Sequence, residues 1–196
     1  TDGIYQLRGF DVANITLIEG KTGWIVVDAM TSRESAAAAM AFARQHLGNK
    51  PVTALVFSHS HIDHFGGALG VLTPQEVAER KVPVIAPAGF MEEATSENVM
   101  VGTAMGRRSI YQFGRDLERS AKGNVDTGLG KNVVYGTFGI LPPTQLITKP
   151  TEELTLDGVR PRGHDKGREG RDEGAGEWAH TCAATHSTAA PGNRVG

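Results

Sequence analysis

Apolar runs separated by polar turns dominate the first half of the chain. Ile15-Thr16-Leu17-Ile18 and Trp24-Ile25-Val26-Val27 flank the turn Gly20-Lys21-Thr22-Gly23, and this pattern predicts two strands joined as a hairpin. Leu55-Val56-Phe57 predicts a buried strand that ends directly before a cluster of histidines. Residues 81–86 predict a further short strand.

Helical patterns lie between these runs. Thr31-Ser32-Arg33-Glu34 fits a capping box with Thr31 as the cap, and the alanine-rich residues 35–47 continue that helix to a stop at Gly48. A second box, Thr73-Pro74-Gln75-Glu76, opens a short helix with proline at its first position. The order strand, strand, helix, strand, helix, strand predicts an α/β fold, namely the first half of an αββα sandwich.

The pattern becomes helical again from Gly89 to about Glu118. Arg107-Arg108 in this segment could bind an anionic group, but a charged pair on a helix more often faces solvent. Asn14 and Asn98 are equally consistent with a polar site contact and with a turn or cap. The segment carries a discontinuous apolar stripe: Val99, Met100, Met105, Ile110, Phe113 and Leu117.

The chain places three imidazoles and a carboxylate within six positions, directly after the third predicted strand. Alternate residues of an extended segment point the same way, so His59 and His61 could reach one metal ion. A turn after them would let Asp63 and His64 face a second point nearby, and Gly66-Gly67 permits tight backbone beside them. The string predicts a metal centre whose ligands are His59, His61, Asp63 and His64.

The donor types indicate the metal and the reaction class. Nitrogen and oxygen donors without thiolate suit zinc first, with manganese or iron as alternatives. A water molecule shared by two such ions is a hydroxide near neutral pH, which indicates hydrolysis. The alternative is a histidine-rich loop that binds metal adventitiously. It is disfavoured because H-x-H-x-D-H is far more specific than a histidine pair.

The H-x-H-x-D-H string is the signature of the metallo-β-lactamase superfamily, and further segments narrow the resemblance. From about Thr1 to about Arg160 the chain resembles the alkyl sulfatase branch, whose members hydrolyse dodecyl sulfate and similar detergents. The segments that carry the resemblance are residues 3–11, Asn14-Ile15-Thr16, the H-x-H-x-D-H-F-G-G form, Ser96-Glu97-Asn98-Val99, Arg107-Arg108 and residues 125–131.

The resemblance implies a zinc-dependent hydrolase of alkyl sulfate esters, with two zinc ions in the complete enzyme. It also implies that Asp28, which ends the second strand of the hairpin, supports the metal-binding loop, although an ordinary turn aspartate fits the sequence equally well. Further carboxylates and a histidine would complete the site in the second half of the sandwich. For the full-length relative, the resemblance implies a homodimer and a periplasmic or secreted location.

The composition changes sharply near Arg160. Residues 161–196 contain no Leu, Ile, Phe, Met or Tyr, so they cannot bury enough apolar surface to offset the entropy of ordering. The sequence therefore predicts a partial metallo-β-lactamase-like domain over residues 1–160 and a disordered or out-of-frame tail over residues 161–196. His180, Cys182 and His186 could be drawn as a metal site in that tail, with Glu169, Glu173 and Glu177 as carboxylates spaced for one helical face. Glycines interrupt any such helix, so the acidic spacing is interpreted as accidental and a metal site in the tail is not expected.

Charge and motifs exclude several other classes. The net charge of −2 leaves no basic stripe for nucleic acid, and no apolar stretch has membrane-spanning length. Gly128-Leu129-Gly130-Lys131 lacks the fuller phosphate-binding string, so nucleotide binding is not expected. Cys182 is the single cysteine, which rules out an internal disulfide.

Two classes of function remain after these exclusions. The first is a metallohydrolase acting on a small-molecule alkyl sulfate, with a lactonase, thiolesterase or β-lactamase as rivals within the same fold. The second is an inactive metal-binding fragment that lacks part of its ligand set.

Overall fold

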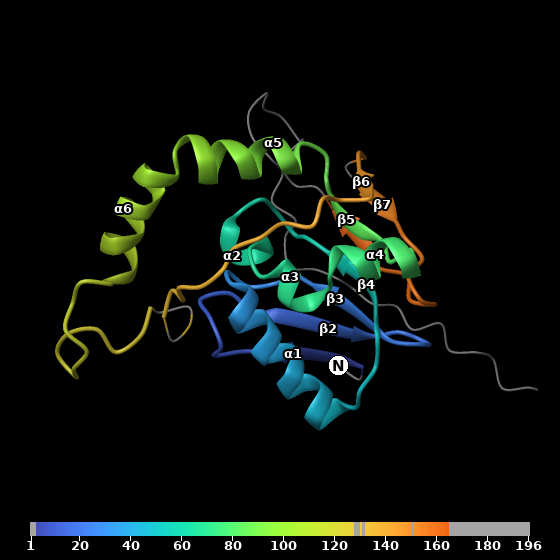
Figure 1. Cartoon of the computed structure of the whole chain (residues 1–196), viewed down its shortest axis with the longest axis horizontal. Coiled ribbons are helices and arrows are strands. Elements are labelled where there is room, and N and C mark those ends of the chain that lie inside the picture. Colours follow the sequence, from blue (N-terminus) through green and yellow to red (C-terminus); the bar gives the residue numbers. More distant parts are fainter. Residues whose placement is uncertain (1–2, 128–129, 131, 150, 165–196) are drawn as a thin grey trace, which may run out of the picture.

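The computed structural model of the chain describes residues 3–127, 130, 132–149 and 151–164. Its centre is a six-stranded sheet with the strand order β1-β2-β3-β4-β5-β6 (Figure 1). The strands β1 to β3 pair in antiparallel fashion, whereas β3 to β6 run parallel. The bounds are β1 (Ile4–Leu7), β2 (Ile15–Glu19), β3 (Trp24–Val27), β4 (Val52–Val56), β5 (Val84–Pro87) and β6 (Gln145–Ile147).

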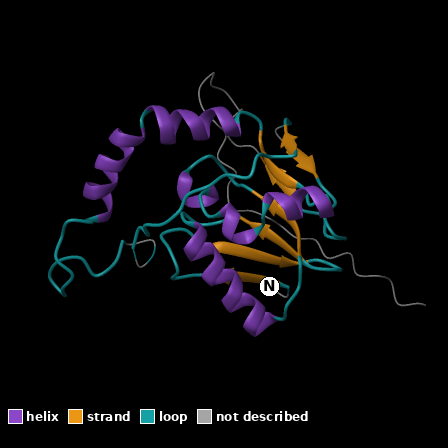
Figure 2. Cartoon of the chain, in the orientation of Figure 1, coloured by secondary structure: helices purple, strands orange, loops and turns teal. Residues whose placement is uncertain are grey.

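Helices occupy the connections between the strands and continue beyond β5 (Figure 2). The longest helix, α1, crosses over between the parallel strands β3 and β4. The bounds are α1 (Arg33–Leu47), α2 (Ile62–Phe65), α3 (Ala68–Val71), α4 (Pro74–Arg80), α5 (Phe90–Thr95), the π-helical turn η1 (Ser96–Met100) and α6 (Gly102–Phe113).

The sheet buries a different set of side chains on each face, because successive residues of a strand point to opposite sides. Leu17, Val26 and Leu55 face a large core that also contains apolar side chains of α1 and α3. Ile18 and Ile25 face a smaller core on the other side, which is closed by residues such as Leu156. The histidine loop is therefore flanked by residues that pack in the large core on one face of the sheet.

The predicted α/β fold is confirmed, including the hairpin of β2 and β3 and the strand that precedes the histidines. The box at Thr73 also forms as predicted, with the Thr73 side chain and the Glu76 side chain each bonded to the other residue's backbone N–H. Strand β1 was not predicted from the hydrophobic pattern, because only Leu7 of its residues is buried.

The predicted cap of α1 was wrong by one residue. Ser32 is the N-cap, and its side chain accepts a hydrogen bond from the Ser35 backbone N–H. Thr31 is instead turned toward the buried Asp11 carboxylate, to which its backbone N–H donates at 2.7 Å and its hydroxyl at 3.1 Å. Glu34 accepts a hydrogen bond from the Thr137 backbone N–H at 2.8 Å. The side chains of Thr31 and Glu34 therefore bond to residues outside the helix and do not form the predicted box.

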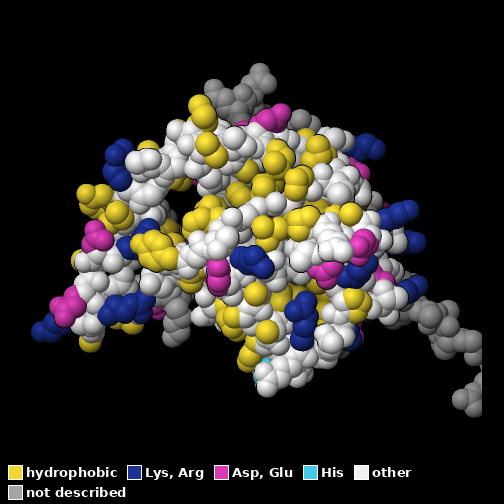
Figure 3. All heavy atoms as spheres, in the orientation of Figure 1, with side chains coloured by type: hydrophobic (Ala, Val, Ile, Leu, Met, Phe, Trp, Pro, Cys, Tyr) yellow, Lys and Arg dark blue, Asp and Glu magenta, His cyan; other side chains and the backbone are white. Residues whose placement is uncertain are grey.

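The helical segment after Gly89 is broken into α5, η1 and α6 rather than continuous. The predicted apolar stripe is only partly covered, since Val99 and Met100 are 73% and 77% exposed. Figure 3 shows hydrophobic side chains at the surface along this part of the molecule. The reason is that neither η1, which contains these two residues, nor α6 buries any residue, and α6 leads away from the sheet (Figure 1).

The last described residues form a small separate sheet. Strands β7 (Thr151–Glu153) and β8 (Arg162–His164) pair in antiparallel fashion, and a turn at Asp157-Gly158 lies between them. His180, Cys182 and His186 lie outside the described residues, as does all of the predicted tail beyond residue 164.

None of the helices in the described part of the chain combines the length and the hydropathy that crossing a membrane requires.

Candidate metal centre

The candidate centre lies where the parallel strands β3 and β4 end. Both carboxyl ends meet at one edge of the sheet, so Asp28, which follows β3, lies beside the loop that follows β4. The Asp28 backbone N–H donates to the Val56 carbonyl at 2.9 Å and thus extends the strand pairing to the start of the loop. Ligand cavities of open α/β sheets commonly form at this end of the strands.

The Asp28 carboxylate organises the start of the loop. It accepts hydrogen bonds at 2.8 Å from the Ser58 backbone N–H and from the Ser58 hydroxyl. Its Oδ2 also lies 2.8 Å from Nδ1 of His64. Asp28 has a positive φ of 63°, a left-handed conformation that aspartate tolerates better than most residues. This turn aims the carboxylate at the loop.

Backbone contacts hold the far end of the loop. The Ala29 N–H donates to the His64 carbonyl at 2.7 Å, and the Gly67 N–H donates to the Met30 carbonyl at 2.9 Å. A Cβ atom at Gly67 would lie 2.1 Å from the Ala29 carbonyl oxygen, so no larger residue fits without a shift of the backbone. The two glycines allow the close approach of backbone that the sequence predicted.

Three aromatic rings form the floor below the loop. Phe57 and Phe90 stack with their ring centroids 5.1 Å apart, and Phe65 meets the Phe90 ring edge-on at 5.6 Å. Phe57 precedes the histidines, Phe65 ends α2 and Phe90 begins α5. This cluster therefore fixes both the loop and the helix that continues toward η1.

The histidine rings lie side by side. The ring centroids of His59 and His64 are 4.0 Å apart, and those of His59 and His61 are 4.6 Å apart. Nε2 of His64 lies 3.5 Å from an Asp63 carboxylate oxygen. The structure thus brings together all four side chains that the sequence predicted as ligands. His61 is the most exposed of them, and its side chain is 56% exposed.

The electrostatics of the loop favour neutral imidazole at His59. Burial, followed by the neighbouring His64 and His61, lowers the pKa of His59 from 6.5 to about 4. A neutral imidazole nitrogen carries the lone pair that a metal needs. Nδ1 of His59 lies 2.9 Å from the Ser58 hydroxyl, which holds the ring at that nitrogen.

The donor set fits a divalent cation in its chemistry. Imidazole nitrogens and a carboxylate are ligands of zinc, and a carboxylate beside Nδ1 of a histidine is the usual outer partner of a metal-binding ring. Within the described residues, no three His, Cys, Asp or Glu side chains converge closely enough to hold an ion. The four side chains of the loop are neighbours, but they do not converge on a common position that an ion could occupy.

Comparison with known proteins identifies the family. Residues 8–188 match the model of the metallo-beta-lactamase superfamily, which is most of the chain. The chain belongs to this superfamily. Membership implies binding of a divalent metal, and the H-x-H-x-D-H loop is the part of the described chain where such donors gather.

Several relatives are sulfatases. The chain is 45% identical over 159 residues to the alkyl/aryl-sulfatase BDS1 of Saccharomyces cerevisiae, covering 81% of this chain and 25% of the relative. It is 49% identical over 157 residues to an (R)-specific secondary-alkylsulfatase of Pseudomonas sp., covering 80% of this chain and 24% of the relative. The stereoselective inverting sec-alkylsulfatase Pisa1 from Pseudomonas sp. superposes with a TM-score of 0.79 at 46% identity, covering 84% of this chain and 26% of that structure.

These comparisons confirm the resemblance to alkyl sulfatases that the sequence suggested. The chain spans about a quarter of the length of these relatives.

Sequence reasoning missed two residues of the site. Ser58 bonds to both Asp28 and His59, and Glu97 on η1 lies 3.5 Å from Nε2 of His61. The only local signal for Ser58 is its place next to the first histidine. Glu97 is far from the loop in sequence, so only the fold brings it there.

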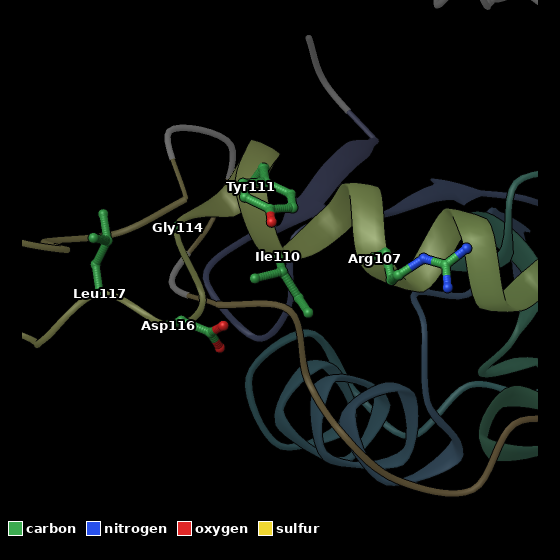
Figure 4. Close-up of a pocket in the computed structure, with 6 residues that line it drawn as sticks. All are labelled: Arg107, Ile110, Tyr111, Gly114, Asp116 and Leu117. Atoms are coloured by element: carbon green, nitrogen blue, oxygen red, sulfur yellow. The ribbon is translucent and has the colours of Figure 1, made fainter.

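The other polar candidates lie elsewhere. Asn98 donates to the Ala94 carbonyl at 2.8 Å and therefore acts within its own helix. Arg107 lines a hollow of about 440 Å³ at the end of α6, which shares no residue with the histidine loop. Figure 4 shows Arg107 and Ile110 projecting from α6, whereas Asp116 and Leu117 belong to the segment that follows.

Proposed function

We propose that the chain is part of a zinc-dependent hydrolase of alkyl sulfate esters, which releases sulfate and an alcohol. The observation that carries the proposal is the loop from His59 to His64 at the carboxyl ends of β3 and β4, tied to Asp28. Its support comes from identities of 45% and 49% to curated sulfatases. Two zinc ions are expected in the complete enzyme.

Each side chain of the loop has a role in this proposal. His59 and His61 would hold one ion, while Asp63 and His64 would hold the second. Asp28 would fix the ring of His64 through Nδ1, and Ser58 would do the same for His59. Bound zinc lowers the pKa of a water molecule and so supplies a nucleophile near neutral pH. The neutral state of His59 keeps that ring ready to bind without first losing a proton.

The organisation of the chain is also part of the proposal. We place a partial metallo-β-lactamase-like domain in residues 1–160 and a separate tail in residues 161–196. The family match runs to residue 188, so this boundary stays a prediction. For the full-length relative we expect a homodimer.

A second candidate is an inactive metal-binding fragment. It is favoured by the arrangement of the described residues, in which no three candidate ligands converge closely enough to hold an ion. A lactonase, thiolesterase or β-lactamase is less well supported, because the high identities are to proteins named as alkylsulfatases.

Sulfate release tests the proposal. The purified chain, supplied with zinc, is incubated with dodecyl sulfate, and free sulfate is measured by ion chromatography beside zinc alone and the His61→Ala variant. Sulfate release that requires His61 supports the hydrolase. Zinc binding without hydrolysis favours the fragment, and turnover of a lactone, thioester or β-lactam in place of dodecyl sulfate favours a rival hydrolase.

A further inference from the structure

We infer that Glu97 is a positioning residue for His61. The inference rests on the proposed metal site, because its consequence is the orientation of one proposed ligand. Nε2 of His61 lies 3.5 Å from Oε1 of Glu97, across a contact between the histidine loop and η1. The two residues come from different elements, so this contact depends on the fold.

The backbone of η1 places Glu97 at this position. The Val101 N–H bonds to the Ser96 carbonyl at 3.1 Å, five residues earlier, which makes a wider turn than in an α-helix. Single π-helical turns of this kind often occur at functional sites. The Asn98 side chain donates to the Ala94 carbonyl at 2.8 Å and helps to hold the wide turn. The turn is thus stabilised by a side chain that the sequence offered only as a general polar candidate.

The start of the preceding helix is also fixed. Phe90, the first residue of α5, is 1% exposed and stacks on Phe57 directly below the loop. The path from Phe90 to Glu97 is a short, continuous helical segment. The packing that anchors the histidine loop therefore also anchors the element that carries Glu97.

The need for such a residue follows from the exposure of His61. The side chain of His61 is 56% exposed, whereas those of His64 and Glu97 are 15% and 21% exposed. An exposed ring loses rotational freedom when it binds a metal, and a partner that holds it beforehand reduces that entropic cost. His59 has Ser58 and His64 has Asp28 for this purpose. Glu97 supplies the corresponding partner for His61.

Zinc affinity measured by chelator competition tests the inference on the whole chain. Glu97→Ala is expected to raise the zinc dissociation constant by about tenfold to hundredfold, as for other outer partners of metal-binding histidines. Glu97→Gln keeps an acceptor oxygen and should recover part of that loss. Glu92→Ala removes an exposed acidic side chain of α5 and serves as the matched control, with an unchanged constant.

A second readout separates positioning from general stability. Cobalt in place of zinc reports ligand geometry through its visible spectrum, which should change in Glu97→Ala but not in Glu92→Ala. If Glu97→Ala leaves both the zinc affinity and the cobalt spectrum unchanged, the inference is wrong, even if the chain hydrolyses dodecyl sulfate. If neither metal binds the unsubstituted chain, the proposed metal site fails and the inference fails with it. If Glu97→Gln lowers the zinc affinity as much as Glu97→Ala does, the positioning of His61 by an acceptor oxygen of residue 97 is overturned.

Discussion

The carboxylate of Asp28 lies 2.8 Å from Nδ1 of His64, although 35 residues and the whole of α1 separate them in the chain. The contact exists because β3 and β4 are parallel neighbours whose carboxyl ends coincide. It fixes the ring of one proposed ligand before any metal arrives. The same carboxylate also bonds to Ser58, so one buried acid organises two parts of the loop.

Replacing Asp28 should therefore weaken metal binding. Asp28→Asn is expected to raise the zinc dissociation constant by about tenfold to hundredfold, because the amide cannot accept from Ser58 and from His64 with the same strength. Chelator competition measures the effect, and Asp116→Asn, at an exposed position, is the control. An affinity within twofold of the unsubstituted chain would show that Asp28 stabilises only the turn after β3 and does not orient His64 for metal binding.

The close backbone at Gly67 predicts a steric effect. A Cβ at this position would meet the Ala29 carbonyl oxygen at 2.1 Å and the Ser32 carbonyl oxygen at 2.5 Å. Gly67→Ala should lower the free energy of unfolding by about 1–3 kcal/mol, as overpacking of a tight site does. Gly106→Ala is the control, because nothing lies within 4 Å of a Cβ there, in the helix α6.

At Gly106 the added methyl group should raise stability by up to about 1 kcal/mol through helix propensity. Urea unfolding of both variants decides the matter. Equal effects at the two glycines would contradict the close packing of the loop.

Removing a ring from the aromatic floor should lower the free energy of unfolding more than removing an aromatic side chain at the surface. Phe90→Ala removes a ring that is 1% exposed and should cost about 3–5 kcal/mol of unfolding free energy. Phe42→Ala removes a ring that is 48% exposed and should cost far less. Thermal unfolding of the two variants provides the comparison, and a similar loss in both would argue against the floor as the support of the loop.

The capping box of α4 predicts a dependence on pH. Hydrogen bonds from the Thr73 backbone and side chain lower the pKa of Glu76 below its ordinary value of 4.5. A carboxyl whose folded pKa is lowered stabilises the fold fully above 4.5 and loses that contribution as the pH falls through the folded value. Glu76→Gln should therefore reduce stability at pH 7 and have a smaller effect at pH 3.

Unfolding by urea at the two pH values checks this prediction. Glu79→Gln makes the same change of charge in the same helix outside the box. A loss from Glu76→Gln that is equal at pH 7 and pH 3 would rule out the ionised carboxylate as the source.

The sequence was sufficient for features that depend on local pattern. The hairpin, the strand before the histidines and the box at Thr73 follow from spacing and turn chemistry, and the structure has all three. The box at Thr31 failed because Asp11, 20 residues away, takes both the hydroxyl and the backbone N–H of Thr31. The capping preferences of neighbouring residues carry no information about a buried carboxylate so distant in the chain.

The same distinction between local pattern and distant contacts applies to the residues of the candidate site. The proposed ligands could be named because they are consecutive in one loop, and Asp28 could be suggested because it ends a strand. Glu97 could not, because its place beside His61 depends on the wide turn of η1 and on the stacking of Phe90 on Phe57. Contacts between elements distant in the chain carry no signal in a hydrophobic pattern.

Zinc binding by the purified chain tests the central claim most directly. The protein is stripped of metal, titrated with zinc, and compared with the His59→Ala/His61→Ala double variant and with His46→Ala, a histidine of α1 outside the loop. The account predicts that the unsubstituted chain and His46→Ala bind zinc with the same affinity, and that the double variant loses this binding. Equal zinc binding by all three proteins would contradict it, because the metal would then be held outside the histidine loop.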